Sequence, residues 1–391
     1  MINITPEIDY IIELLKCAVT DNVPSVPSEK INWDKVFKLG VRHKICSTLY
    51  FGLQKLPESV QKSIGHFPKY QFAYQQNLVA DANRAFEIQN LKPDFQSNHI
   101  DFIFLKGSVT KYLYPDTSMR TMNDIDIYYR GVDLKTVISV FKKHGYEITK
   151  KEPKEIGFFK KINKIKIEMQ TQLVDDGYEV WADYLKDGWN QYEKISNSTE
   201  YRMSSEDFYI YHIIHMAKHF KNGGIGLIHV LDTWILSNSN INMDTSYVHE
   251  ELNKIGLETF ESNVRILLKC WFEDFVPDEN TAETITMMTK YFFRSGAFGT
   301  KTQQETNHII ENGQTKLSMI QKIFPNQKTM VNYYGNALKK YPFLIPFYWI
   351  RLNFTRLFIT RKRSKKSFVV LNKITDERIR DTKELMKRCG L

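Results

Sequence analysis

Two aspartates separated by one isoleucine stand at the start of an apolar run, a spacing that suits cation binding. Residues 124–127 read Asp-Ile-Asp-Ile. In an extended strand alternate side chains point the same way, so Asp124 and Asp126 project together while Ile125 and Ile127 point into a core. Two adjacent carboxylates repel each other unless a cation lies between them. Magnesium prefers oxygen ligands and often keeps substrate phosphates in its shell, so the pair predicts a site for Mg²⁺ and a nucleoside triphosphate.

A second feature, a glycine turn, precedes these aspartates. The apolar residues 102–105 end in Lys106, Gly107 and Ser108, which predicts a strand, a tight turn and the start of a helix. Because Gly107 lacks a Cβ, its backbone can approach a phosphate closely. Ser108 adds a hydroxyl and an amide at the expected helix N-terminus. The turn is therefore complementary to the triphosphate that the carboxylates predict.

A third carboxylate is offered by residues 164–170, where apolar and polar side chains alternate. The alternation predicts a half-buried strand with Glu168 on its polar face. We expect this strand to lie beside the Asp124 strand. Glu168 would then either help to hold the metal ions or take the proton from an attacking hydroxyl, and the sequence leaves both roles open.

These motifs resemble those of a known enzyme group. Gly107-Ser108 followed by Asp124-Ile125-Asp126 is similar to the signature of the DNA polymerase beta-type nucleotidyltransferase superfamily. A narrower resemblance is to the bacterial uncharacterised nucleotidyltransferase family, which is associated with surface-polysaccharide gene neighbourhoods. The residues that carry it are Leu105-Lys106-Gly107, Leu113-Tyr114-Pro115, Arg120, Asp124-Ile125-Asp126, Trp33-Asp34, His43, His215-Met216-Ala217-Lys218-His219 and Asp232.

The resemblance implies a magnesium-dependent enzyme with two metal ions. It would transfer a nucleoside monophosphate from a nucleoside triphosphate, ATP among the candidates, to a hydroxyl of an acceptor, and would release pyrophosphate. Asp124, Asp126 and Glu168 would be catalytic and would bind the metal, with Arg120 contacting the nucleotide phosphates. The acceptor is not readable, although the gene neighbourhoods favour a sugar-like or polysaccharide-related molecule. Fifteen residues separate Ser108 from Asp124, which is more than the superfamily usually shows but typical of the narrower family.

Three histidines mark a second candidate constellation. Ser204 followed by acidic residues predicts a helix from Ser205 to Phe220. On it, His212, His215 and His219 are spaced so that they share one face, which could bind zinc. The chain offers neither the glutamate of a zincin motif nor a cysteine partner, so structural or substrate-facing histidines are favoured.

The resemblance gives this helix a role beside the nucleotide. It implies that the helical region after the core closes over the nucleotide, which would place His215, Lys218 and His219 on the acceptor side. There Lys218, with one or two of the histidines, would supply positive charge or hydrogen bonds to the phosphates. Asp232 would either line the acceptor side or bond a histidine and hold two helices together.

Composition and periodicity predict an α+β protein with a small mixed-sheet nucleotidyltransferase core between N-terminal and C-terminal helical domains. The chain has 391 residues, 42% of them hydrophobic, which is enough for a large core. Four scattered cysteines and an N-terminus without a signal-peptide pattern predict a reduced, cytoplasmic protein. The expected divisions are a helical domain at 1–95, the core at 96–190, a second helical domain at 195–340 and an aromatic and basic tail at 341–391.

The tail carries the net charge of the chain. Residues 341–391 contain 13 Lys and Arg against 4 Asp and Glu, so the first 340 residues are formally neutral and give no strong nucleic-acid signal. Residues 341–350 are apolar but too few to span a bilayer, and residues 361–366 are basic. Helical spacing of apolar side chains leaves two interpretations, a helix packed on the body or one lying on an anionic membrane at the inner face. The side chains are Phe347, Ile350, Phe354, Leu357 and Phe358.

Other classes of function remain open at this point. The chain could keep the fold as a non-catalytic nucleotide-binding or scaffold protein, or act as a membrane-surface adaptor through its tail. The sequence does not reveal base preference or oligomeric state.

Overall fold

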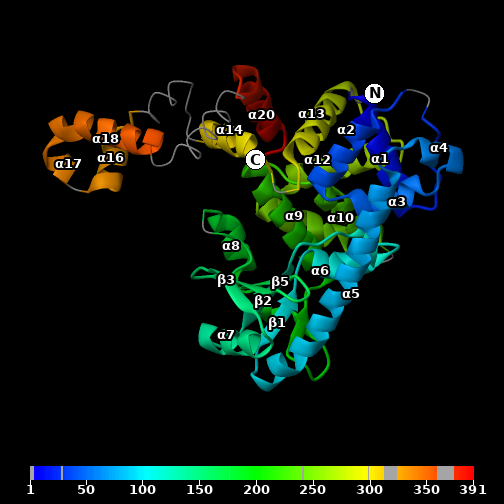
Figure 1. Ribbon diagram of the computed structural model, residues 1–391, viewed down its shortest axis with the longest axis horizontal. Coiled ribbons are helices and arrows are strands. Elements are labelled where there is room, and N and C mark those ends of the chain that lie inside the picture. Colours follow the sequence, from blue (N-terminus) through cyan, green and yellow to red (C-terminus); the bar gives the residue numbers. More distant parts are fainter. Residues whose placement is uncertain are drawn as a thin grey trace.

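The computed structural model describes most of the chain, namely residues 4–27, 30–175, 177–239, 242–297, 299–311, 324–335, 337–358 and 374–391. A mixed seven-stranded sheet lies at one end of the body. Helices that precede the strands in the sequence and helices that follow them pack together at the other end (Figure 1). The predicted α+β class with helical flanks is confirmed. In the part of the chain that is described, no helix is long and apolar enough to cross a membrane.

In the described residues before the sheet, the chain forms five helices. Helix α2 begins after Asn32, whose side chain accepts a hydrogen bond from the backbone N–H of Lys35 and so satisfies one of the free donors at the helix start. Helix α3 packs between α1 and α5, and all three contribute buried apolar side chains to the largest core. The bounds are α1 Pro6–Val19, α2 Trp33–His43, α3 Cys46–Leu53, α4 Glu58–Ser63 and α5 Phe67–Ser97.

Helix α5 connects these helices to the sheet. Its first half packs against α3, and Leu91 and Phe95 near its end belong to the core beneath the sheet (Figure 1). Between them, buried polar side chains hold the loop that precedes the second strand. Asn77 Nδ2 donates to the carbonyl of Ser118 at 2.5 Å, and Arg84 Nη1 donates to the carbonyl of Met122 at 3.2 Å. The loop that carries Arg120 is therefore fixed on a long helix.

The sheet has the strand order β3-β4-β5-β2-β1-β7-β6. Strand β2 runs parallel to β5 and antiparallel to β1, and β1 runs parallel to β7. The antiparallel pairs β3-β4, β4-β5 and β6-β7 complete it. The bounds are β1 Asp101–Phe104, β2 Ile125–Arg130, β3 Glu147–Lys151, β4 Glu155–Lys160, β5 Ile165–Gln170, β6 Glu193–Lys194 and β7 Glu200–Arg202.

The two faces of the sheet are covered differently. Ile125 and Ile127 lie on the face that packs against α5 and α7 (Leu134–Lys143) in a separate apolar core. Asp126 and Tyr128 alternate with them and lie on the other face, toward α9 (Ser205–Lys221) and α10 (Leu227–Asn238). The predicted direction of both isoleucines into a core is confirmed.

The sheet continues past residue 190, where the sequence placed the end of the core. Strands β6 and β7 come after that point, and β7 pairs with β1. The predicted helix at 205–220 is α9, and Ser204 caps it by accepting from the N–H of Asp207 at 3.0 Å. The remaining helices are α8 Glu179–Lys186, α11 Thr245–Lys254, α12 Glu258–Phe272, α13 Glu279–Ser295, α14 Lys301–Glu311, α16 Gln327–Tyr334, α17 Ala337–Lys340, α18 Ile345–Phe358 and α20 Asp376–Arg388.

The segment expected as a tail divides into two parts. Helix α20 packs on α13 and α14, with Leu385 and Cys389 fully buried. Helices α16, α17 and α18 instead form an arm with a small apolar cluster of their own (Figure 1). The basic run at residues 361–366 and the side chains of Leu357 and Phe358 lie outside the described residues.

Candidate active site

The three predicted carboxylates lie together because β2 and β5 are paired in parallel. Asp126 is in register with Glu168, and Asp124 directly precedes β2. In a parallel pair, residues in register place their side chains on the same face, so the Asp126 and Glu168 carboxylates are neighbours. The expectation that the Glu168 strand lies beside the Asp124 strand is therefore confirmed.

Two lysines lie among these carboxylates. Lys106 Nζ is 2.7 Å from Asp126 Oδ1, and Lys166 Nζ is 3.3 Å from Asp124 Oδ2 and also contacts Glu168 Oε1. Burial lowers the pKa of Lys106 and of Lys166, but the facing carboxylates outweigh this and raise both pKa values above their usual range. Both lysines are therefore charged at neutral pH.

The site raises the pKa of the Asp124 carboxyl group. Burial raises its pKa above the ordinary value of 3.8, and the negative charges of Asp126 and Glu168 raise it further against the opposing effect of Lys166 and Lys106. An added cation would lower that cost. The donor set therefore fits a hard divalent ion in residue type, since all three side chains offer oxygen.

In this structure Lys106 and Lys166 form ion pairs with the three carboxylates. In the described ranges, no three His, Cys, Asp or Glu side chains are grouped closely enough to hold a metal ion. The ammonium groups of Lys106 and Lys166 contact the same oxygens that would serve as ligands. An incoming cation would therefore compete with them.

The glycine turn has the predicted order of elements. Strand β1 is followed by Lys106 and a four-residue helix, α6 (Gly107–Thr110). Lys106 has φ +51°, a backbone conformation that residues with a Cβ rarely adopt. A Cβ on Gly107 would lie 3.1 Å from Cζ of Arg120 and 3.1 Å from Cγ of Met122. The glycine therefore admits the Arg120 guanidinium close to the backbone of the turn.

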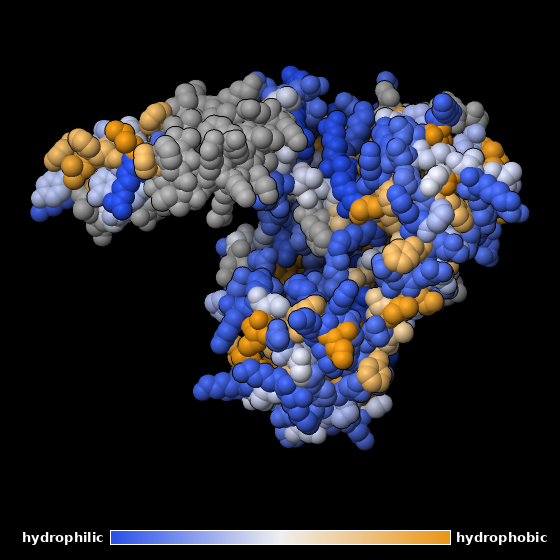
Figure 2. Space-filling model, in the orientation of Figure 1, coloured by the Kyte–Doolittle hydropathy of each residue, from blue (hydrophilic) through white to orange (hydrophobic). Residues whose placement is uncertain are grey.

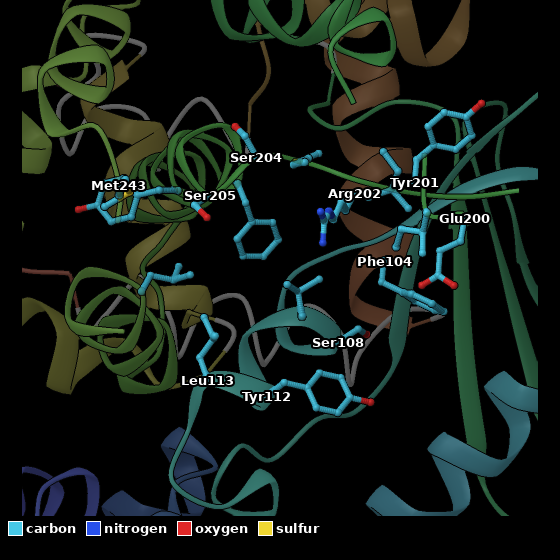
Figure 3. Close-up of a pocket in the computed structure, with 17 residues that line it drawn as sticks. Phe104, Ser108, Tyr112, Leu113, Glu200, Tyr201, Arg202, Ser204, Ser205 and Met243 are labelled. Carbon is cyan, nitrogen blue, oxygen red and sulfur yellow. The ribbon is translucent and has the colours of Figure 1, made fainter. Parts of the chain in front are cut away.

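Ser108 lies apart from the carboxylates. Its side chain lines a second cavity of about 290 Å³, which is mostly apolar and is bordered by the end of β1, by β7 and by the start of α9 (Figure 3). The hydroxyl is buried and has no hydrogen-bond partner among the described residues. Because Gly107 lines the carboxylate cavity and Ser108 lines the other, α6 separates the two.

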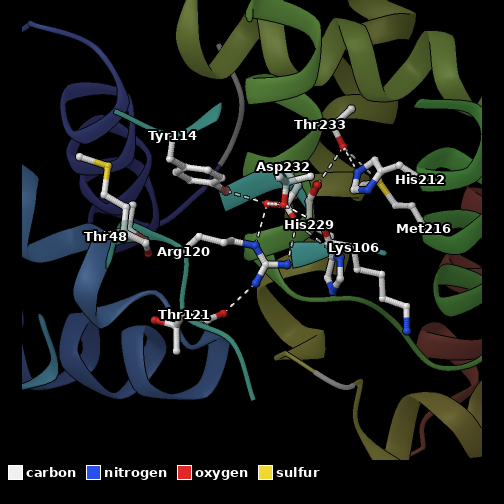
Figure 4. A network of polar contacts seen from close by, with 12 residues as sticks. Thr48, Lys106, Tyr114, Arg120, Thr121, His212, Met216, His229, Asp232 and Thr233 are labelled. Carbon is white, nitrogen blue, oxygen red and sulfur yellow. Dashed lines mark hydrogen bonds and ion pairs between the residues drawn. The ribbon is translucent and has the colours of Figure 1, made fainter. Parts of the chain in front are cut away.

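Arg120 is held by Asp232 from α10 (Figure 4). Its Nε and Nη2 each donate to a different Asp232 oxygen at 2.7 Å, and its Nη1 donates to the carbonyl of Thr121 at 2.7 Å. Tyr114 Oη and Thr110 Oγ1 also donate to Asp232 Oδ1, at 2.9 and 3.3 Å. Such two-point pairing fixes the plane of the guanidinium. The main partner of Asp232 is thus an arginine, and His229 Nδ1 lies 4.0 Å from it.

The predicted histidines separate into two groups. His212 does not line the cavity that holds the carboxylates, and its Nε2 contacts Thr233 Oγ1 at 2.9 Å. The His215 and His219 rings lie 4.4 Å apart between centroids, and the His229 ring lies 5.6 Å from that of His215. Burial lowers the pKa of all three, that of His219 to about 4. They are neutral at pH 7, so without ligand they offer hydrogen bonds and no positive charge.

One cavity of about 330 Å³ brings most of these groups together. Four of the predicted residues do not line it, namely Ser108, His212, Lys218 and Asp232. Lys218 Nζ instead pairs with Asp175 Oδ2 at 3.0 Å. Lys44, Lys166 and His229 line it and were not predicted. Lys166 could have been found, because it shares the strand face of Glu168. The residues that line the cavity include Lys44, Lys106, Gly107, Arg120, Asp124, Asp126, Lys166, Glu168, His215 and His219.

Comparison with curated proteins and with solved structures found no match. A family match covers residues 29–273, which include helices α2 to α5, the whole sheet and the helices α8 to α12. The matched range contains every residue that lines the carboxylate cavity except Ala297. The family is described as uncharacterised nucleotidyltransferase, and the chain belongs to it and is a nucleotidyltransferase enzyme.

Proposed function

We propose that the enzyme transfers a nucleoside monophosphate from a magnesium-bound nucleoside triphosphate to a hydroxyl of an acceptor at this cavity. One observation carries the proposal, the meeting of Asp124, Asp126 and Glu168 on neighbouring strands beside the glycine turn. A single Asp-x-Asp motif would support it weakly, whereas three carboxylates in one cavity that the glycine turn also lines support it together.

The charge of the cavity suits a triphosphate with its cation. Three carboxylates face four cationic side chains, those of Lys44, Lys106, Arg120 and Lys166. Asp124, Asp126 and Glu168 would hold magnesium, which when bound neutralises charge on the phosphates and orients them. The lysines displaced from the carboxylates would then be available to the phosphate oxygens. His215 and His219 would donate hydrogen bonds, and a bound triphosphate would raise their pKa values.

The transfer step requires a nucleophile and a leaving group in line at phosphorus. The acceptor hydroxyl oxygen forms a bond to the α-phosphorus, and the bond from that phosphorus to the bridging oxygen breaks. Pyrophosphate leaves with the electron pair. A Glu168 carboxylate oxygen takes the hydroxyl proton, because Glu168 is in register with Asp126 and so lies beside the metal ligands. Lys106 and Lys166 hold the phosphates in place, and the cavity walls exclude bulk water from phosphorus.

Isothermal titration with each nucleoside triphosphate, with and without magnesium, tests the site. We expect magnesium-dependent binding that is lost when Asp124→Ala and Asp126→Ala are combined. A charge-matched control combines Glu147→Ala in the exposed strand β3 with Glu152→Ala directly after it, both away from the cavity, and should bind as the native protein does. Failure of the native protein to bind any nucleoside triphosphate would contradict the proposal.

A second experiment separates binding from transfer. Glu168→Gln keeps the shape of the side chain and removes the base, so we expect it to bind nucleotide but not to transfer. The measurement follows an α-phosphate label from the nucleotide to sugar-like, lipid-linked, protein or RNA acceptors, with pyrophosphate release as the second product. We propose a sugar-like or polysaccharide-related acceptor first. Loss of nucleotide binding in Glu168→Gln would instead assign Glu168 to the metal alone.

We also propose that the enzyme works in the cytoplasm. The four cysteines are all unpaired, and Cys17, Cys46 and Cys389 are buried. Buried thiols without disulfides fit a reducing compartment. Fractionation of cells with an antibody against the protein tests this, and recovery from an extracellular fraction alone would contradict it.

A further inference from the structure

The positive charge of the chain is concentrated in one segment. Residues 312–375 contain 13 Lys and Arg and neither Asp nor Glu, whereas the rest of the chain contains 41 Lys and Arg against 45 Asp and Glu. The catalytic body is therefore slightly acidic and this segment strongly basic. Such a separation of charge favours a polyanionic partner that binds this segment and not the body.

The described part of this segment is an arm that protrudes from the body (Figure 1). Met330, Leu338 and Ile345 form its small buried cluster, and Trp349 Nε1 donates to the carbonyl of Pro325 at 2.8 Å. The arm is held together by these contacts between α16, α17 and α18. These contacts bury the apolar side chains on the inner face of the arm, where the three helices meet.

The outer face exposes large apolar side chains side by side. Phe343, Phe347 and Ile350 are 71%, 70% and 69% exposed, and their spacing places them along one side of η4 (Pro342–Leu344) and α18. Orange, apolar atoms gather on the arm in the space-filling view (Figure 2). Single exposed apolar residues are normal on a protein surface, but three adjacent ones of this size indicate a contact with something apolar.

Exposed cations border this apolar face. Lys339 and Lys340 directly precede it and are exposed, as is Arg351 within α18. Apolar side chains flanked by lysine and arginine are the composition of helices that lie on anionic bilayers, where the cations contact headgroups and the apolar side chains enter the acyl boundary. Nucleic acid would attract the cations but would leave the aliphatic Ile350 in water. The combination therefore favours a lipid surface over a polynucleotide.

We propose that the arm docks the enzyme on the surface of anionic phospholipid membranes. Phe343, Phe347 and Ile350 insert at the bilayer boundary, and Lys339 and Lys340 contact the phosphate groups. Helix α18 has 14 residues, about 21 Å at 1.5 Å per residue, so it lies on the surface and does not span it. This inference does not depend on the proposed reaction.

Flotation of the full chain with lipid vesicles tests the inference. We expect the protein to float with vesicles of phosphatidylcholine plus phosphatidylglycerol, to float much less with phosphatidylcholine alone, and to dissociate as salt is raised. The variant that combines Phe347→Asp and Ile350→Asp should lose binding by about tenfold or more, because it removes apolar insertion and adds negative charge. Its nucleotide binding should be unchanged, which separates this result from the proposed function.

The matched control makes the same changes on another exposed apolar pair. Phe72 and Val79 on α5 are 57% and 61% exposed, so the combination of Phe72→Asp and Val79→Asp adds the same charge and also removes two exposed apolar side chains. It should float as the native protein does. The inference would be overturned if the native protein floated with neither kind of vesicle. It would also be overturned if the two double variants floated equally. So would a dimer in sedimentation velocity that only the arm variant abolishes, since the face would then join two copies of the chain.

Discussion

At the scale of single residues, Asp124 combines a functional position with a cost in stability. Its pKa is raised in the folded protein, so the native state binds a proton more tightly than the unfolded chain does. The ionised carboxylate therefore destabilises the fold at neutral pH, and this cost disappears as the pH falls below the ordinary value of 3.8. Active-site residues commonly carry such a cost.

The change Asp124→Asn should therefore stabilise the metal-free protein. We expect the free energy of unfolding at pH 7 to rise by up to about 1 kcal/mol, with the gain shrinking as the pH is lowered toward 4. Urea unfolding at several pH values measures it, with Glu147→Gln at the exposed β3 as control. A loss of stability at pH 7 would mean that the ion pair with Lys166 outweighs the repulsion from Asp126 and Glu168.

Lys106 has a positive φ, which glycine adopts more readily than lysine does. We expect Lys106→Gly to be more stable than Lys106→Ala by about 1–2 kcal/mol, because only the glycine relieves the backbone. Both variants remove the ammonium beside Asp126, so both should lose nucleotide affinity to a similar extent. Thermal unfolding and titration with magnesium and nucleotide measure the two effects. Equal stability of the two variants would contradict the strain argument.

At the scale of elements, the Arg120–Asp232 pair joins the loop before β2 to helix α10. Both side chains are buried, and Asp232 accepts four hydrogen bonds. Removing one charge leaves the other buried without a partner. Asp232→Leu should therefore lower the free energy of unfolding by about 3–5 kcal/mol.

The double change Arg120→Leu with Asp232→Leu provides the control for this pair. It removes both charges, so part of the lost stability should return relative to Asp232→Leu alone. Chemical unfolding of the single and double variants measures the coupling. Additive losses would show that packing, and not the uncompensated charge, causes the destabilisation.

The same elements show what sequence reasoning could and could not reach. Alternation of apolar and polar residues predicted β2 and β5 and the face of Glu168, because a strand has a period of two. The partner of Arg120 was missed because Asp232 lies 112 residues away and local pattern carries no information about that distance. The direction of the Ser108 side chain was also missed, since the motif does not reveal which side of a four-residue helix each position faces. The neutral state of His215 and His219 follows from burial, which appears only once α9 and α10 are packed.

At the scale of the whole molecule, the arm is separable from the catalytic body. Arg378 Nη2 donates to Gln303 Oε1 at 2.6 Å, so α20 and α14 are in direct contact although 64 residues separate the two helices. Replacing residues 312–373 by a short glycine–serine linker should preserve the body and its nucleotide binding. A shorter connection also loses less entropy on folding, so stability should stay level or rise by about 1–2 kcal/mol.

Truncation after residue 311 is the matched experiment. It removes α20 as well as the arm and exposes the surface that Leu385 and Cys389 cover, so it should destabilise the body by several kcal/mol. Thermal unfolding of both deletions measures the contrast. Equal stability of the linker variant and the truncation would show that α20 contributes nothing to the body.

The contact between α14 and α20 also has a consequence during translation. A ribosome adds about 5–20 residues per second, so several seconds pass between the synthesis of α14 and that of α20. During that interval the arm has emerged while the helix that closes the loop on the body has not. In a nascent chain near a bilayer, the arm would contact the lipid before α20 had been synthesised. Helix α20 would then pack on α13 and α14 and bring the two ends of the arm together at a body that had already folded.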